Sequence, residues 1–246
     1  MSEKILGISG PKQSGKTTAV NFLHGYELYR NGVIERFEIT DDGNLVVNTE
    51  YTNADGVVEK GFGELDIFRK DYQFIDYASN NIWPYVKSYG FADPLKTICM
   101  NLFGLTYEQC YGSEEEKNSN TKVSKPNGTL VFTARELMQY VGTNMFRILK
   151  PDVWTSYCLE QVLEEKSGLA IIGDCRFPNE VETIRQAGGK VIRFLRCPHP
   201  DGHSSEVALD NYNEFDVVID NSKMSVEEQN QEVLSTLIQW GWIEST

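Results

Sequence analysis

The sequence predicts an α/β fold: a doubly wound parallel sheet with helices on both faces and a β-hairpin insertion. Two observations carry this prediction. Short apolar runs typical of buried strands alternate along the chain with longer stretches of helical periodicity. A glycine-rich turn joins the first of these strands to the first helix. The length of 246 residues suits one large domain with an insertion, so we predict a single domain over residues 1–246.

The first strand and helix flank the glycine-rich turn. The strand is expected at 4–9 and the first helical turns at 17–23. Between them Gly10–Thr17 reads GPKQSGKT, which fits the pattern G-x-x-x-x-G-K-T. In this pattern, backbone N–H groups face a phosphate, the Lys16 ammonium lies beside it, and the Thr17 hydroxyl is a ligand for Mg²⁺. We therefore expect a P-loop NTPase-type fold; the alternative is an ordinary glycine-rich strand–helix turn.

Residues 31–87 read as an antiparallel insertion. Strand-forming segments at 33–40 and 45–51 flank the turn DDGN at 41–44, which predicts a β-hairpin. A second turn is expected at 53–56, followed by another extended segment at 57–60. Because phosphate chemistry does not require a hairpin, we interpret the insertion as an embellishment or an oligomer contact rather than a substrate site.

The remaining core elements have local start and stop signals. Asp93 at the N-cap and Pro94 at the first helical position begin a helix that Gly104 ends. Thr133 and Glu136 have capping-box spacing and open a helix through Val141. The polar stretch 112–128 is expected to be a loop. The other expected strands are 86–92, 169–173, 190–195 and 216–219, and the other helices are 151–166, 178–187 and 225–240.

Composition restricts the partners. The net charge of −13, from 23 basic and 36 acidic residues, disfavours nucleic-acid polymers and acidic membranes. No window approaches 18 apolar residues, and the first strand begins too early for a signal peptide, so neither a membrane span nor a leader is expected. Five cysteines without a C-x-x-C pair suggest reduced thiols in a cytoplasm. Cys197, His199 and His203 match no standard zinc spacing.

Among proteins with such a loop, a small kinase fits best. The chain lacks the D-x-x-G and N/T-K-x-D patterns of regulatory GTPases. The strand at 169–173 runs into Asp174 without the adjacent second carboxylate of motor-type ATPases. Cations follow the strands, where ligands of open α/β sheets bind. These cations are Lys96, Arg176 and Arg196, and Arg135 could join them from its helix.

Several short motifs, in this order, resemble the bacteriophage deoxynucleoside monophosphate kinases. Residues 7–18 look like the opening of that family. The other similar segments are FADPLK at 91–96, RELMQYVGTN at 135–144, Trp154, DCRFPNE at 174–180, IRFLR at 192–196, HSSE at 203–206 and DVVIDN at 216–221. The resemblance covers roughly two thirds of the chain and leaves the hairpin insertion outside.

The resemblance implies ATP-dependent phosphorylation of deoxynucleoside 5′-monophosphates to diphosphates, with Mg²⁺ bound at Thr17. Lys16, Asp174 and Arg176 would be catalytic, with Glu180 one helical turn from Arg176 to fix its side chain. The implied nucleotide-binding residues are Gly10, Lys12, Ser14, Gly15, Lys16, Thr17, Thr18, Arg196 and Asn221. The implied substrate-binding residues are Lys96, Arg135, Gly142, Thr143, Trp154, Asp174 and Glu180. For Trp154 the alternative is an ordinary core tryptophan.

Two other functions remain open at this point. One is a P-loop kinase for another phosphorylated metabolite, such as dephospho-coenzyme A. The other is a non-catalytic regulatory protein whose ATP site only stabilises a conformation. The expected location is cytoplasmic (host cytoplasm for a phage-encoded chain), and the resemblance suggests a homodimer.

Overall fold

The computed structural model describes residues 4–52, 57–126, 128, 130–198 and 208–244. The chain divides into two compact units. The first unit contains Met1–Tyr89 and Gln161–Thr246, and the second contains Gly90–Glu160. The single domain over residues 1–246 stays a prediction.

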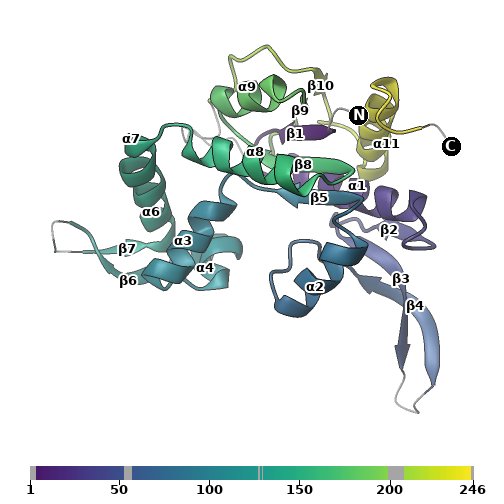
Figure 1. Cartoon of the computed structure of the whole chain (residues 1–246), viewed down its shortest axis with the longest axis horizontal. Coiled ribbons are helices and arrows are strands. Elements are labelled where there is room, and N and C mark those ends of the chain that lie inside the picture. Colours follow the sequence, from purple (N-terminus) through teal and green to yellow (C-terminus); the bar gives the residue numbers. More distant parts are fainter. Residues whose placement is uncertain (1–3, 53–56, 127, 129, 199–207, 245–246) are drawn as a thin grey trace. The chain divides into compact units, whose positions relative to one another are not determined.

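A five-stranded parallel sheet forms the centre of the first unit (Figure 1). Its strands lie in the order β10-β9-β1-β8-β5, so β1 is central. Every neighbouring pair is parallel. The strands are β1 (Ile5–Ser9), β5 (Val86–Tyr89), β8 (Leu169–Cys175), β9 (Lys190–Phe194) and β10 (Val217–Ile219). The parallel α/β sheet predicted from the sequence is therefore confirmed.

Helices cover both faces of this sheet. Leu6 and Ile8 of β1 share a buried cluster with residues of α1 (Lys16–Arg30) and α11 (Val226–Gln239). Gly7 points to the opposite face, because successive strand residues alternate. There a Cβ on Gly7 would lie 2.8 Å from Ile184 of α9 (Pro178–Gln186). Glycine at this position lets α9 pack closely against the central strand.

The insertion forms a second, antiparallel sheet that packs on α1. Its order is β2-β3-β4, with β2 at Phe37–Ile39, β3 at Leu45–Thr52 and β4 at Val58–Glu64. The predicted hairpin is confirmed, and the extended segment expected at 57–60 corresponds to β4, which pairs with β3 and runs further than expected. Leu45 is 1% exposed in the main core, and the Phe37 ring lies 5.9 Å from that of Phe22. The turn predicted at 53–56 lies outside the described residues.

The sequence reading of 31–87 as antiparallel overlooked one helix. Residues Tyr72–Asn81 form α2, and the Asp71 carboxylate caps it by accepting the N–H of Phe74 at 3.0 Å. Phe74 and Ala78, one helical turn apart, are buried in the main core. This i, i+4 pair on a short amphipathic segment was the available signal for the helix.

The second unit is mainly helical and contains a two-stranded ribbon. Its buried cluster includes Leu105, Phe132, Leu137 and Val141. The ribbon pairs β6 (Asn120–Ser124) with β7 (Val131–Thr133) in antiparallel order (Figure 1). The helices are α3 (Asp93–Phe103), α4 (Tyr107–Tyr111), α5 (Glu114–Lys117), α6 (Ala134–Gln139), the π-helix η1 (Tyr140–Phe146) and α7 (Arg147–Leu149). Helix α8 (Val153–Glu165) begins in this unit and ends in the first.

Several boundary predictions need correction. The stretch 112–128 is not a plain loop, because a Ser113–Glu116 capping box starts α5 and β6 follows it. The N-cap of α3 is Ala92 rather than Asp93, and Asp93 is the first helical residue. The helix opened by the Thr133–Glu136 capping box continues past Val141 as η1. Strand β8 runs two residues further than expected, so Asp174 lies within it.

Candidate active site

The loop between β1 and α1 is the centre of the candidate site. Gln13 and Gly15 have φ angles of 59° and 95°, in the left-handed region. A Cβ on Gly10 would lie 2.5 Å from Ser14 Oγ, so the chain curls tightly on itself. Gly15 is the N-cap of α1, and the N–H groups at the start of a helix point outward and can bind an anion. This backbone has the shape required to hold a phosphate group.

The Lys16 side chain folds back over this loop. Its Nζ donates to Gly10 O at 2.7 Å and to Pro11 O at 2.6 Å. Thr17 is exposed at the first turn of α1, and Lys12 and Thr18 are half-buried. The ammonium group is therefore held at the loop. If a phosphate binds there, the ammonium can donate to its charged oxygens in place of the two carbonyl groups.

The ends of β8 and β9 bring charged groups beside the start of the loop. Ser9 is in register with Cys175 on one side and with Arg193 on the other. Buried Arg193 donates to Ser9 Oγ at 3.0 Å and to Asp210 Oδ1 at 3.3 Å. Burial and the nearby Glu180 and Asp174 carboxylates raise the pKa of the Cys175 thiol. Sequence reasoning missed Arg193, although an arginine inside an apolar strand was a visible signal.

Glu180 holds the backbone that follows β8. Its buried Oε2 accepts the N–H of Arg176 at 2.7 Å and that of Phe177 at 3.0 Å. The sequence reading had placed this carboxylate on the Arg176 side chain. The hydrogen bonds show that it fixes the backbone at Arg176, which is an exposed residue, and its contact with the Arg176 side chain stays a prediction.

Asn221 lies against the loop, and Arg196 lies against Asn221. The Arg196 guanidinium donates to Asn221 O and Met224 O, at 2.8 and 2.5 Å from Nη2. Asn221 Nδ2 donates to Ser14 O at 2.6 Å. Gln229, which sequence reasoning missed, donates from Nε2 to Gly15 O at 3.1 Å. A single polar position on an amphipathic helix gave no sequence signal for this contact.

The second unit contains the expected acceptor cations. Lys96 Nζ lies 4.0 Å from the centre of the Tyr111 ring, and Tyr111 Oη donates to Asp93 Oδ1 at 3.1 Å. Burial and the adjacent Asp93 carboxylate raise the pKa of Tyr111. Arg135 donates from Nη2 to Glu114 Oε2 at 2.8 Å. The Arg135–Glu114 pair is solvent-exposed, so it contributes little and can be exchanged for a phosphate.

The expected acceptor-lining residues centre on η1. Gly142 is buried, Thr143 is exposed, and a Cβ on Gly142 would lie 2.8 Å from Leu95 Cδ2. Trp154 is 5% exposed, and its Nε1 donates to Gly142 O at 3.4 Å. π-helical turns of this kind are frequent at functional sites. The burial of Trp154 suits a core residue that supports η1, and its contact with an acceptor stays a prediction.

Other sequence-based expectations concern the histidines, metal binding, membrane helices and the cysteines. His203 and Glu206, from the HSSE segment, lie outside the described residues, as does His199. Within the described ranges, no three His, Cys, Asp or Glu side chains gather as a metal site. None of the described helices is long and apolar enough to cross a membrane. All five cysteines are described, and each is present as a thiol.

The sheet order, the strand–loop–helix unit and the loop conformation define a P-loop NTPase-type α/β protein. A family model described as "Deoxynucleotide monophosphate kinase" matches residues 4–233. A protein of Acanthamoeba polyphaga mimivirus, described as "Putative deoxynucleotide monophosphate kinase", is 31% identical over 159 residues. The match covers 59% of this chain and 79% of the viral protein.

The chain therefore belongs to the deoxynucleotide monophosphate kinase family. The resemblance inferred from the short motifs is confirmed, and so is the activity that it implied, phosphorylation of deoxynucleotide monophosphates.

Proposed function

We propose that this kinase transfers the γ-phosphoryl group of ATP to the 5′-phosphate of a deoxynucleoside monophosphate, releasing ADP and a deoxynucleoside diphosphate. The observation that carries this proposal is the 10–17 loop, whose left-handed residues and helix N-cap form an anion cradle beneath the Lys16 ammonium. Family membership alone would leave the phosphate donor open, whereas this cradle suits the phosphates of a nucleotide.

The loop residues would hold the donor. Backbone N–H groups of Gly10 and of residues 12–18 would bind the β- and γ-phosphates, with the Lys12 and Ser14 side chains beside them. Lys16 would exchange the Gly10 and Pro11 carbonyls for phosphate oxygens. Thr17 would ligate Mg²⁺, which supplies charge neutralisation on the phosphates. Its exposed hydroxyl at the helix start fits that role.

Residues at and after the carboxyl end of β8 would act on the transferring group. Arg176 presents a planar fork of donors that can bridge two phosphate oxygens as negative charge shifts between them. Glu180 keeps this segment in place through the backbone N–H of Arg176. Asp174, beside the start of the loop, would orient the acceptor or the metal ion. Together these residues stabilise charge rather than form a covalent intermediate.

The second unit would hold the acceptor. Lys96 and Arg135 would bind its phosphate, with Arg135 leaving its exposed partner Glu114. Gly142 and Thr143 would line the nucleotide through backbone and hydroxyl groups, and Trp154 would pack beside them. Arg196 and Asn221 remain assigned to the donor side, where Asn221 contacts the loop at Ser14 O and Arg196 contacts Asn221.

We further propose a cytoplasmic homodimer that acts on free nucleotides rather than on nucleic-acid polymers. The five thiols suit a reducing compartment. The net charge of −13 opposes binding to a polyanion, so phosphates would bind at a local pocket. Size-exclusion chromatography with light scattering would test the dimer.

A coupled ADP-release assay tests the function. ATP and Mg²⁺ are supplied with deoxynucleoside monophosphates, the matching ribonucleotides, or dephospho-coenzyme A. We expect ADP release that requires a deoxynucleoside monophosphate. Release that requires dephospho-coenzyme A instead would support a kinase for another metabolite. ATP binding without release for any acceptor would support the regulatory alternative.

A further inference from the structure

We infer that Asn221 and Gln229 are positioning residues that hold the phosphate loop in its binding conformation. We call this pair of side chains the amide clamp. Asn221 is 0% exposed and Gln229 is 1% exposed, so both amides are fully committed to the protein interior. The inference rests on the proposed function, because it assumes that the 10–17 loop binds the donor nucleotide.

The amide clamp donates hydrogen bonds to two successive carbonyl groups of the loop. Asn221 Nδ2 donates to Ser14 O at 2.6 Å, and Gln229 Nε2 donates to Gly15 O at 3.1 Å. The two clamp residues come from the far end of the chain, after β10 and within α11. Their contacts therefore join the C-terminal segment to the loop near the N-terminus.

The network permits one orientation of each amide. The backbone N–H of Arg196 can only donate, and it donates to Asn221 Oδ1 at 2.8 Å. That contact directs Asn221 Nδ2 toward Ser14 O and toward Gln229 Oε1, which it reaches at 2.6 Å. Gln229 Nε2 is then left to face Gly15 O, which can only accept. Each of the two buried amide nitrogens donates to a backbone carbonyl, and each amide oxygen accepts a hydrogen bond.

The geometry of the peptide bond makes these contacts matter for phosphate binding. In a trans peptide the C=O and N–H groups point in opposite directions within one plane. The hydrogen bond that holds Ser14 O toward Asn221 therefore also fixes the direction of the Gly15 N–H. Holding Gly15 O does the same for the Lys16 N–H. These two N–H groups start α1, where an anion would bind.

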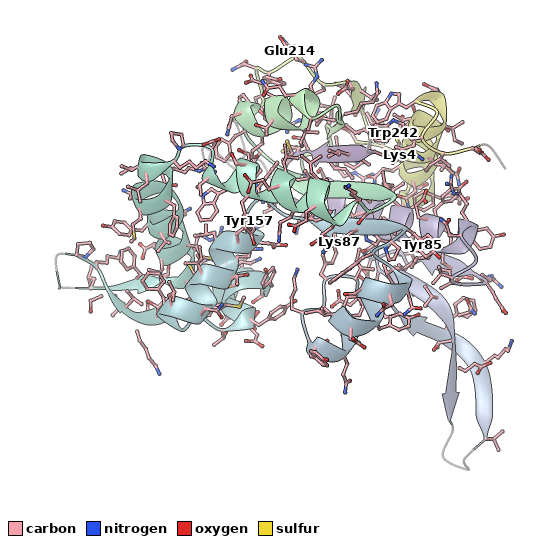
Figure 2. The ribbon with its side chains drawn as sticks, viewed as in Figure 1. Lys4, Tyr85, Lys87, Tyr157, Glu214 and Trp242 are labelled. Carbon is pink, nitrogen blue, oxygen red and sulfur yellow. The ribbon has the colours of Figure 1, made fainter. Side chains whose placement is uncertain are left out.

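Helix α11 is fixed firmly enough to serve as this support. At its start, Ser225 and Glu228 form a capping box. Beyond its end, Lys4 Nζ donates to Trp242 O at 2.5 Å, which ties the chain back to β1 (Figure 2). A Cβ on Gly15 would lie 2.3 Å from Gln229 Oε1, so glycine is needed for this close approach as well as for its φ of 95°.

The test compares Gln229→Glu and Gln229→Met with Gln231→Glu. The first variant removes the donor to Gly15 O but keeps an acceptor for Asn221, and the second removes both groups at similar volume. Gln231 is exposed on the same helix, so its variant controls for the added charge. Each protein is assayed by calorimetry with a non-hydrolysable ATP analogue, by steady-state kinetics for both substrates, and by thermal unfolding.

We expect both Gln229 variants to raise the Kd for the analogue and the KM for ATP by roughly ten- to hundredfold. The KM for the deoxynucleoside monophosphate should stay near that of the wild type, as should all constants of the control. If the wild type binds no analogue, the proposed function itself fails.

Two outcomes would overturn the clamp while leaving the proposed function standing. In the first, the wild type binds the analogue and the Gln229 variants bind it as tightly as Gln231→Glu does. In the second, both KM values rise together with a large fall in Tm, which would make Gln229 a general structural residue.

Discussion

At the scale of single residues, buried polar side chains around the loop are the main determinants of its shape. Glu180, Arg193, Asn221 and Gln229 are all buried; the first two bond to groups at or beside strand ends, and the last two bond to carbonyl groups of the loop. Burying such groups without partners would cost several kcal/mol in total, at about 1–3 kcal/mol each. Their pairing makes the surrounding backbone stiff before any ligand arrives.

Arg176→Lys should lower kcat about a hundredfold and change the KM for ATP much less. Arg176 follows β8, and its planar guanidinium can bridge two oxygens of the transferring group where an ammonium cannot. The measurement is kcat with both KM values, and circular dichroism to confirm folding. Arg185→Lys is the matched control, because Arg185 is an exposed α9 residue paired with Glu214 at 3.2 Å. Unchanged kinetics would return Arg176 to an ordinary surface arginine.

His24 gives the fold a pH dependence of known sign. It is 2% exposed in α1, its Nδ1 lies 2.9 Å from Val20 O, and burial lowers its pKa from 6.5 to about 4. The unfolded chain binds a proton below pH 6.5 that the folded chain refuses until about pH 4. Stability from His24 is therefore complete above pH 6.5 and is lost as the pH falls through this window.

Between pH 7.5 and pH 5, protonation of His24 in the unfolded chain should lower the free energy of unfolding by about 2 kcal/mol. Urea unfolding of the wild type and of His24→Leu at both pH values measures it. The variant should lose that much less over the same interval. Buried Glu27, whose pKa is raised by burial, works in the opposite direction, but it is present in both proteins and cancels in the comparison. Equal pH dependences would contradict the assignment.

At the scale of elements, local signals predicted the type of an element better than its limits. The capping box at Thr133 and the glycine at 104 marked real helix ends. The continuation of α6 into the π-helix η1 could not be predicted, because it depends on packing: Gly142 lies against Leu95, and its carbonyl accepts from Trp154. Strand β6 was missed because it is short and mostly polar, and helix α2 was missed because its i, i+4 apolar pair was overlooked within a segment interpreted as antiparallel.

The antiparallel insertion has an inner part, around Gly43 and Leu45, that contacts α1 and the main core. We call residues 50–60, at the far end of β3 and β4, the outer hairpin. Asn21 Nδ2 of α1 donates to Gly43 O at 2.8 Å, and Leu45 is in the main core. Removing all of 33–60 would therefore delete core contacts, at about 2–5 kcal/mol for Leu45 alone. This changes the simple view of the insertion as an appendage.

Shortening only the outer hairpin should leave nucleotide binding intact. Thr49 and Gly61 are opposite each other in the β3–β4 register, so an Asn-Gly turn can join them in place of residues 50–60. We expect the shortened protein to bind the ATP analogue as the wild type does, with a similar Tm, as calorimetry and thermal unfolding would show. A well-folded variant that no longer binds the analogue would make the outer hairpin part of the nucleotide site.

At the scale of the whole molecule, the sequence-predicted site residues fall into two groups. The loop, Asp174, Arg176, Arg196 and Asn221 belong to the first unit, at or after the carboxyl ends of its parallel strands. Lys96, Arg135, Gly142 and Thr143 belong to the second. This division suits a transferase with separate donor and acceptor sites. The short motifs and their order predicted these site residues. The hydrogen-bonding network around them could not be predicted, because it depends on contacts between segments that are distant in the sequence.

The central claim is that the 10–17 loop holds the phosphate donor for transfer to a deoxynucleoside monophosphate. The most direct test uses ATP labelled at its γ-phosphate and the best acceptor from the ADP-release panel, with wild type, Lys16→Ala and the exposed-lysine control Lys122→Ala. We predict that wild type and control place the label on the deoxynucleoside diphosphate, and that Lys16→Ala folds normally yet transfers almost none, because it lacks the ammonium beside the phosphates. Normal label transfer by folded Lys16→Ala would contradict the account.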